Sequence, residues 1–133
     1  GVLSALTDAE SKQDAIAVLP HLERRRFVGL LRRLRSSGGV LIGNSSAALI
    51  EAAALGVPAV DIGPRQGGRE RAGNVVHVDS PAHAELKAAI SQAQSIGDSS
   101  ISHPYGRTGE RVAALLASID PVQPGYLRKR SVY

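Results

Sequence analysis

The sequence predicts an α/β protein with a doubly wound, Rossmann-like parallel sheet. Short apolar runs alternate along the chain with longer segments of helical character, which is the pattern of a layered α/β domain. The runs are mostly apolar, as expected for strands that helices cover on both faces. Glycine or proline ends several of the segments, so their boundaries can be read from the sequence.

Short apolar runs are expected to form the strands. They are residues 15–19, 40–42, 59–62 and 74–78. A doubly wound domain usually has about five or six strands, so we expect the chain to hold roughly the last two-thirds of one. Residues 1–120 are expected to form this single domain, incomplete at its N-terminal end, and residues 121–133 an irregular tail.

Helices are expected between and after these strands. The first is arginine-rich and ends near Ser36, and its apolar residues recur at spacings of three and four. The second, residues 46–55, is rich in alanine and ends at Gly56. The third opens at Pro81 and the fourth at Thr108, which are residue types that favour the first turn and the N-cap.

Composition excludes several classes of protein. The chain is 43% hydrophobic and 21% charged, which is ordinary for a globular protein, and it has no cysteine for disulfides or thiolate metal sites. No apolar run approaches the ~20 residues that span a bilayer, and no signal peptide is visible. We therefore expect a cytoplasmic location and no membrane partner.

The basic residues and histidines have plain explanations. The net charge is +4, and arginines gather in the first helix on the flanks of its apolar stripe, which is typical of a solvated helix face. Aromatic residues are only 3% of the chain, too few to stack on bases, so we expect no nucleic-acid partner. The histidines do not fall at metal-ligand spacings, and we expect no metal. His21, His77 and His83 are expected at the surface or in loops, and His103, with Tyr105, nearer a ligand cleft.

A serine-rich loop follows the second expected strand. Residues Gly43-Asn44-Ser45-Ser46 lead directly into the alanine-rich helix. Ligands of parallel α/β sheets bind where such loops leave the carboxyl ends of the strands. The unpaired amides and positive end of the following helix favour phosphate, and the serine hydroxyls add donors. Simple capping of the helix by Asn44 and Ser45 is the alternative explanation.

Glu51 follows this loop at a spacing that suggests a second contact with the same ligand. In a continuous helix it lies five residues beyond Ser46, about 7.5 Å along the axis. Helical side chains lean toward the N-terminus, so its carboxylate is expected to point toward a bound phosphate. An acceptor there suits the vicinal hydroxyls of a ribose. The other carboxylates are expected to lie away from the phosphate loop.

The loop after the third expected strand, IGPRQGGRER, is rich in glycine and arginine. Glycines allow the backbone to approach a ligand, and arginine supplies planar donors for phosphate. A solvated, mobile loop is the alternative, but a position beside the serine-rich loop favours ligand binding. The candidates in it are Arg65, Gln66, Arg69 and Arg71.

The segment GNSSAALIEAAALGVPAVDIGPRQGGRERAGNVVHV resembles the C-terminal half of UDP-N-acetylglucosamine 2-epimerases, and most of all their hydrolysing branch. Those enzymes share the GNSS loop, a helix with this glutamate and an IG-x-RQ-x-GR loop. The segment HPYGRTGERVAALL resembles their PYG motif and the helix after it. The likeness extends over residues 19–116. Departures are Ala47 and Ala48, where members often have glycine, and Pro64, where a polar residue is more frequent.

The resemblance implies a GT-B architecture, in which this chain is the UDP-binding C-terminal domain and an N-terminal domain of the same protein completes the cleft. It implies that Ser45, Ser46 and the amides after them hold the diphosphate, with Arg69 nearby. Glu51 would then hold the ribose. The full set of implied UDP-binding residues is Asn44, Ser45, Ser46, Ala47, Glu51, Arg65, Gln66 and Arg69.

The implied reaction eliminates UDP across C1 and C2 of the sugar, and hydrolysing members then add water to give N-acetylmannosamine. No cofactor is implied, and the catalytic carboxylates and histidine are expected upstream, so these 133 residues alone are expected to be inactive. A homodimer and the identity of the amino sugar are left open. Two other classes also stay open: the nucleotide-sugar-binding half of a GT-B glycosyltransferase, and a non-catalytic regulatory domain of the same fold.

Overall fold

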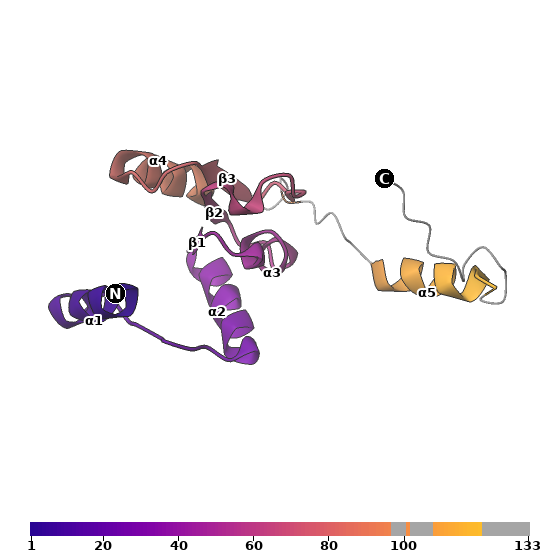
Figure 1. The fold of residues 1–133 in the computed structure, drawn as a ribbon, viewed down its shortest axis with the longest axis horizontal. Helices are drawn as coiled ribbons and strands as arrows, with labels where there is room; N and C mark the ends of the chain where they lie inside the picture. The colour runs from indigo at the N-terminus through magenta and orange to yellow at the C-terminus, as the bar shows by residue number, and fades with distance from the viewer. Residues whose placement is uncertain (97–100, 102–107, 121–133) are drawn as a thin grey trace. The chain divides into compact units, whose positions relative to one another are not determined.

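The computed structural model describes residues 1–96, 101 and 108–120 (Figure 1). The irregular tail expected at 121–133 lies outside the described residues, as do His103 and Tyr105. Contacts divide the chain into two units, residues 1–102 and 103–133, and each is described by itself.

The first unit contains a three-stranded parallel sheet, which confirms the α/β class (Figure 1). The strands are β1 (Leu41–Gly43), β2 (Ala59–Ile62) and β3 (Val75–Val78), in the order β1-β2-β3. The strand expected at 59–62 is confirmed residue for residue, and those expected at 40–42 and 74–78 differ by one residue at their ends. Because both pairs are parallel, all three strands end at the same edge of the sheet.

Helices cover both faces of this sheet. On one face lie α2 (Arg24–Ser37), the short turn η1 (Ser46–Ala48) and α3 (Glu51–Ala54), and on the other lies α4 (His83–Gln94). Successive strand residues point to opposite faces, which explains the division of the core. In β2, fully buried Ala59 packs with Ala48 and Leu49, and fully buried Val60 packs with Ala89 and Ala93.

Helix α2 is attached to α3 through its apolar stripe. Leu31 is fully buried and packs against Ala52 and Val57, with Phe27 and Leu34 beside it. Burial of one such leucine side chain stabilises the fold by about 1.5–3 kcal/mol. The helix ends at Gly38, whose φ of 70° is a left-handed conformation that glycine adopts without steric cost.

The strand expected at residues 15–19 is wrong. A strand requires a neighbour to satisfy its backbone groups, and none of the three described strands pairs with this segment. Its Val18 N–H donates instead to Glu10 Oε1 at 2.8 Å. Glu10 belongs to a helix that was not expected, α1 (Val2–Lys12).

The continuous helix expected at 46–55 is also wrong. The chain makes one 3₁₀ turn at η1 and then a single α-helical turn at α3. The side chain of Asn74, fully buried before β3, donates to the carbonyl of Ala48 at 2.9 Å and to that of Val57 at 3.0 Å. In a regular helix the Ala48 carbonyl would accept from the N–H of residue 52, so this insertion accounts for the break.

The helices expected to open at Pro81 and Thr108 are both present. The first, α4, starts two residues after Pro81, and the second, α5 (Thr108–Ser118), starts at Thr108 itself. Helix α5 belongs to the second unit. Among the residues that the structure describes, no helix has both the length and the apolar character needed to span a membrane.

Candidate nucleotide-binding site

The turn after β1 presents backbone donors at the carboxyl edge of the sheet. Asn44 and Ser45 are exposed, and Ser46 and Ala47 are half-buried. The Ser45 hydroxyl oxygen accepts a hydrogen bond from the Ala47 N–H at 3.3 Å, so Ser45 caps η1. Capping therefore explains Ser45. Within the described residues the N–H groups of Ser45 and Ser46 make no hydrogen bond, which leaves both as donors for a ligand.

The break in the expected helix changes the electrostatics of this turn. A macrodipole is the sum of aligned peptide dipoles. The 3₁₀ turn η1 (Ser46–Ala48) contributes only one turn of them, and the α-helical turn α3 starts separately at Glu51. The attraction for phosphate therefore depends on individual N–H groups and nearby cations more than on a long helix. Those cations come from the next loop.

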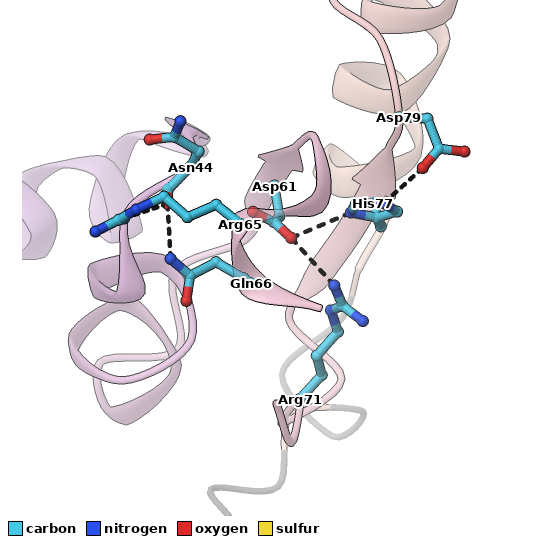
Figure 2. Close-up of polar contacts among 7 residues, drawn as sticks. All are labelled: Asn44, Asp61, Arg65, Gln66, Arg71, His77 and Asp79. Atoms are coloured by element: carbon cyan, nitrogen blue, oxygen red, sulfur yellow. Dashed lines mark hydrogen bonds and ion pairs between the residues drawn. The ribbon is translucent and has the colours of Figure 1, made fainter. Parts of the chain in front are cut away.

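The loop after β2 is fixed to the turn after β1 (Figure 2). Gly63 has a φ of 77°, and the 3₁₀ turn η2 (Pro64–Gln66) follows it. Both Arg65 Nη1 and Gln66 Nε2 donate to the backbone carbonyl of Asn44, each at 2.7 Å. Two consecutive residues of one loop thus share a single acceptor in the other, and the structure brings Asn44, Arg65 and Gln66 together as a unit.

These two donors have different surroundings. Arg65 is exposed, so its guanidinium can hold Asn44 and still face a ligand. Gln66 is only 1% exposed, which places its amide beneath the loop as an internal support. Direct contact of Gln66 with a nucleotide stays a prediction.

Arg69 and Arg71 belong to the same glycine-rich loop but differ in their partners. The Arg69 side chain is exposed and makes no hydrogen bond or ion pair within the described part of the chain. Arg71 Nη2 instead donates to Asp61 Oδ2 at 3.1 Å, which ties the far end of the loop to β2. The structure thus leaves Arg69 exposed and pairs Arg71, whose side chain is 33% exposed, with the buried carboxylate of Asp61.

A cluster around Asp61 was not foreseen (Figure 2). Asp61 is fully buried and lies opposite Gly43 on one side and His77 on the other in the strand register. Its Oδ2 accepts from Arg71 and lies 3.1 Å from His77 Nδ1, and His77 Nε2 lies 3.1 Å from Asp79 Oδ1. The buried charge of Asp61 is compensated by the Arg71 guanidinium.

One expectation about this region is wrong and another is confirmed. Asp61 is a carboxylate next to the phosphate loop, because its register partner Gly43 directly precedes Asn44. His77 was expected at the surface or in a loop, and it is an exposed residue of β3 whose side chain is 32% exposed, so the surface position is confirmed. The available signal was that Asp61 and His77 each interrupt an apolar strand, and parallel pairing places them side by side.

Glu51 has a partner that the sequence did not indicate. It opens α3, and its Oε1 lies 3.3 Å from Arg24 Nη1 in the first turn of α2. The arginines of α2 were expected to form a solvated face. The Arg24 side chain is indeed 79% exposed, but the sequence did not indicate its ion pair with Glu51.

A small cavity of about 120 Å³ opens between α2 and the turn after β1. Its walls are apolar side chains and backbone from three elements, and they include the chain's single phenylalanine, Phe27, which sequence reasoning did not assign to the site. The lining residues are Phe27, Leu41, Ile42, Gly43, Ser45, Ala47 and Ala48. No group of three or more acidic or histidine side chains in the described ranges is arranged to hold a metal ion.

Backbone donors, exposed arginines and an apolar cavity at the carboxyl edge of a parallel sheet define a Rossmann-like α/β protein with a candidate anion-binding site. Comparison with known proteins gives the family. The chain belongs to the UDP-N-acetylglucosamine 2-epimerase family, whose model matches residues 2–117.

Two curated relatives are similar over part of their length. The chain is 34% identical over 126 residues to a protein of Legionella pneumophila named UDP-N,N'-diacetylbacillosamine 2-epimerase (hydrolyzing), covering 89% of this chain and 30% of that protein. It is 33% identical over 86 residues to a UDP-N-acetylglucosamine 2-epimerase of Neisseria meningitidis, covering 65% of this chain and 22% of that protein. The chain thus spans less than a third of the length of either relative.

Proposed function

We propose that this chain provides the UDP-binding part of a hydrolysing UDP-N-acetylglucosamine 2-epimerase with a GT-B architecture. Membership of the epimerase family supports the enzyme class. The observation that carries the binding role is the joined pair of loops, in which Arg65 and Gln66 hold the Asn44 carbonyl at 2.7 Å. That link fixes an arginine-bearing loop beside a turn with two backbone donors.

In the proposed complex the diphosphate lies at the turn after β1. The N–H groups of Ser45 and Ser46 and the hydroxyl of Ser46 donate to it, and the exposed Arg65 and Arg69 neutralise its charge. The cavity beside Phe27 accepts the apolar face of the nucleoside. Glu51 accepts hydrogen bonds from the ribose hydroxyls.

This arrangement favours departure of UDP. Breaking the bond between C1 and UDP leaves negative charge on the diphosphate, and donors already in place stabilise that charge in the transition state. The proton removed from C2 and the water that is added require acid–base groups within hydrogen-bond reach of the sugar. We propose that those groups come from outside the 133 residues, and that these residues alone are inactive. A cytoplasmic location stays a prediction.

A second substrate has a specific observation in its favour. The Legionella relative is named for UDP-N,N'-diacetylbacillosamine, and its match covers 89% of this chain. The two candidates differ in the sugar and share the UDP. The site described above therefore serves either substrate, and the sugar must be identified by experiment.

Product analysis of the intact protein tests the proposal. We expect incubation with UDP-N-acetylglucosamine, or with the diacetamido sugar nucleotide, to release UDP and a free 2-epimerised sugar without any acceptor. Formation of UDP-N-acetylmannosamine would contradict the hydrolysing assignment. Turnover that requires an added acceptor would indicate a glycosyltransferase, and UDP binding without turnover of either substrate would favour a regulatory domain.

A further inference from the structure

One face of α2 is directed at α3, the segment that carries Glu51, the proposed ribose-binding residue. Arg24, Phe27 and Leu31 are spaced by three and four residues, so they lie on the same side of the helix. Leu31 packs against Ala52 of α3, and Phe27 lines the cavity beside Ser45. At the N-terminal end of this face, Arg24 reaches Glu51.

The contact holds one side of the Glu51 carboxylate. Oε1 lies 3.3 Å from Arg24 Nη1, and in the part of the chain that the structure describes Oε2 has no hydrogen-bond partner. The Glu51 side chain is 25% exposed, so a ligand can still reach it. The carboxylate is thus held through one oxygen and keeps acceptor capacity on the other.

We propose that Arg24 is a positioning residue for the nucleotide, which orients Glu51 so that its carboxylate accepts hydrogen bonds from the ribose hydroxyls of UDP. This inference rests on the proposed function. Glutamate loses side-chain rotamer freedom when it is fixed on a ligand, and a carboxylate held before binding loses less.

The pair contributes little to folding, which makes it testable. The Arg24 side chain is 79% exposed, and exposed ion pairs add little to stability. Arg24→Ala is therefore expected to fold normally. Its effect on UDP binding is expected to be a loss of about two- to fivefold, which is the range of an exposed ion pair.

Arg25 supplies a matched control. It is the next residue of α2, carries the same charge and is exposed, but among the described residues it makes no hydrogen bond or ion pair with Glu51. Arg25→Ala therefore removes one positive charge from the same turn and leaves the Arg24–Glu51 contact in place. A general charge effect on UDP would appear equally in both variants.

The experiment is calorimetric titration of the wild-type protein, Arg24→Ala, Arg25→Ala, Glu51→Ala and the double variant Arg24→Ala/Glu51→Ala. Each is titrated with UDP and with 2',3'-dideoxy-UDP, which lacks the ribose hydroxyls. We expect Arg24→Ala to weaken UDP two- to fivefold and the dideoxy ligand less than about 1.5-fold. Arg25→Ala is expected to leave both nearly unchanged, and Arg24→Ala to add no loss in the Glu51→Ala background.

Equal losses in Arg24→Ala and Arg25→Ala, or equal losses for the two ligands, would overturn the positioning role. So would a full additional loss when Arg24→Ala is combined with Glu51→Ala. Absence of UDP binding by the wild-type protein would instead overturn the proposed function itself, so the two failures are distinguishable.

Discussion

The side-chain amide of Gln66 donates a hydrogen bond to the backbone carbonyl of Asn44 across 2.7 Å, and this bond joins the loops that follow two neighbouring parallel strands. Gln66 is 1% exposed and Asn44 is exposed, so the bond is part-buried, and its donor comes from the interior (Figure 2). The proposed phosphate-binding turn is therefore held by one buried side chain, Gln66, and one exposed side chain, Arg65.

Gln66→Ala is expected to destabilise the protein by about 1–3 kcal/mol, because it removes a hydrogen bond made by a buried side chain. The matched control is Arg65→Ala, which removes a bond of equal length to the same carbonyl from an exposed side chain and is expected to cost less than about 1 kcal/mol. Urea denaturation followed by circular dichroism measures both. Equal costs would show that burial of Gln66 does not matter.

Asp61→Asn is expected to destabilise the protein by about 1–3 kcal/mol, because Arg71 loses its carboxylate partner while the buried position keeps its shape. Asp79→Asn offers the comparison, since Asp79 contacts the same histidine through a side chain that is 97% exposed. We expect less than about 0.5 kcal/mol for that change. Thermal and urea unfolding of the two variants measures both changes. A larger loss of stability in Asp79→Asn than in Asp61→Asn would contradict the account.

Asn74→Ala is expected to cost about 2–4 kcal/mol, because it removes two hydrogen bonds to the Ala48 and Val57 carbonyls and leaves a small cavity. Asn74→Asp, which replaces the donating amide by a carboxylate facing two carbonyls, is expected to be worse still. Hydrogen exchange of the amides in residues 46–57 measures the local effect. Unchanged protection there in Asn74→Ala would show that the buried amide does not secure this segment.

Glu51→Ala is expected to weaken UDP by about 1.5–3 kcal/mol and inorganic phosphate much less, because only UDP carries ribose hydroxyls for the carboxylate to accept. Calorimetric titration with the two ligands makes the comparison. Equal losses for both would remove Glu51 from the ribose-binding role.

The sheet was predictable because its strands are short, apolar and bounded by glycine or proline. Ala59–Ile62 is the clearest case, since both faces of β2 are covered and the strand coincides with a short run that is apolar except for Asp61. The strand expected at 15–19 failed because an apolar run does not disclose whether a neighbour is present to pair with it. The break at residues 49–50 was hidden because it depends on Asn74, which lies far from it in sequence.

The candidate site was predictable where the pattern is local and not where contacts are distant. The turn at Asn44–Ser46 and the loop with Arg65 and Gln66 follow directly from glycine, serine and arginine beside strand ends. The pairs Arg24–Glu51 and Asp61–Arg71 link residues 27 and 10 positions apart, and nothing in a single sequence fixes such partners.

The most direct test of the central claim is a titration of the ¹⁵N-labelled protein with UDP, followed by amide NMR shifts. The account predicts saturable binding, with the largest shifts at Ser45, Ser46 and Ala47 and a second group at Gly63 and residues 65–69. These are the amides of the two joined loops. Absence of binding, or shifts concentrated on α4 at the opposite face of the sheet, would contradict it.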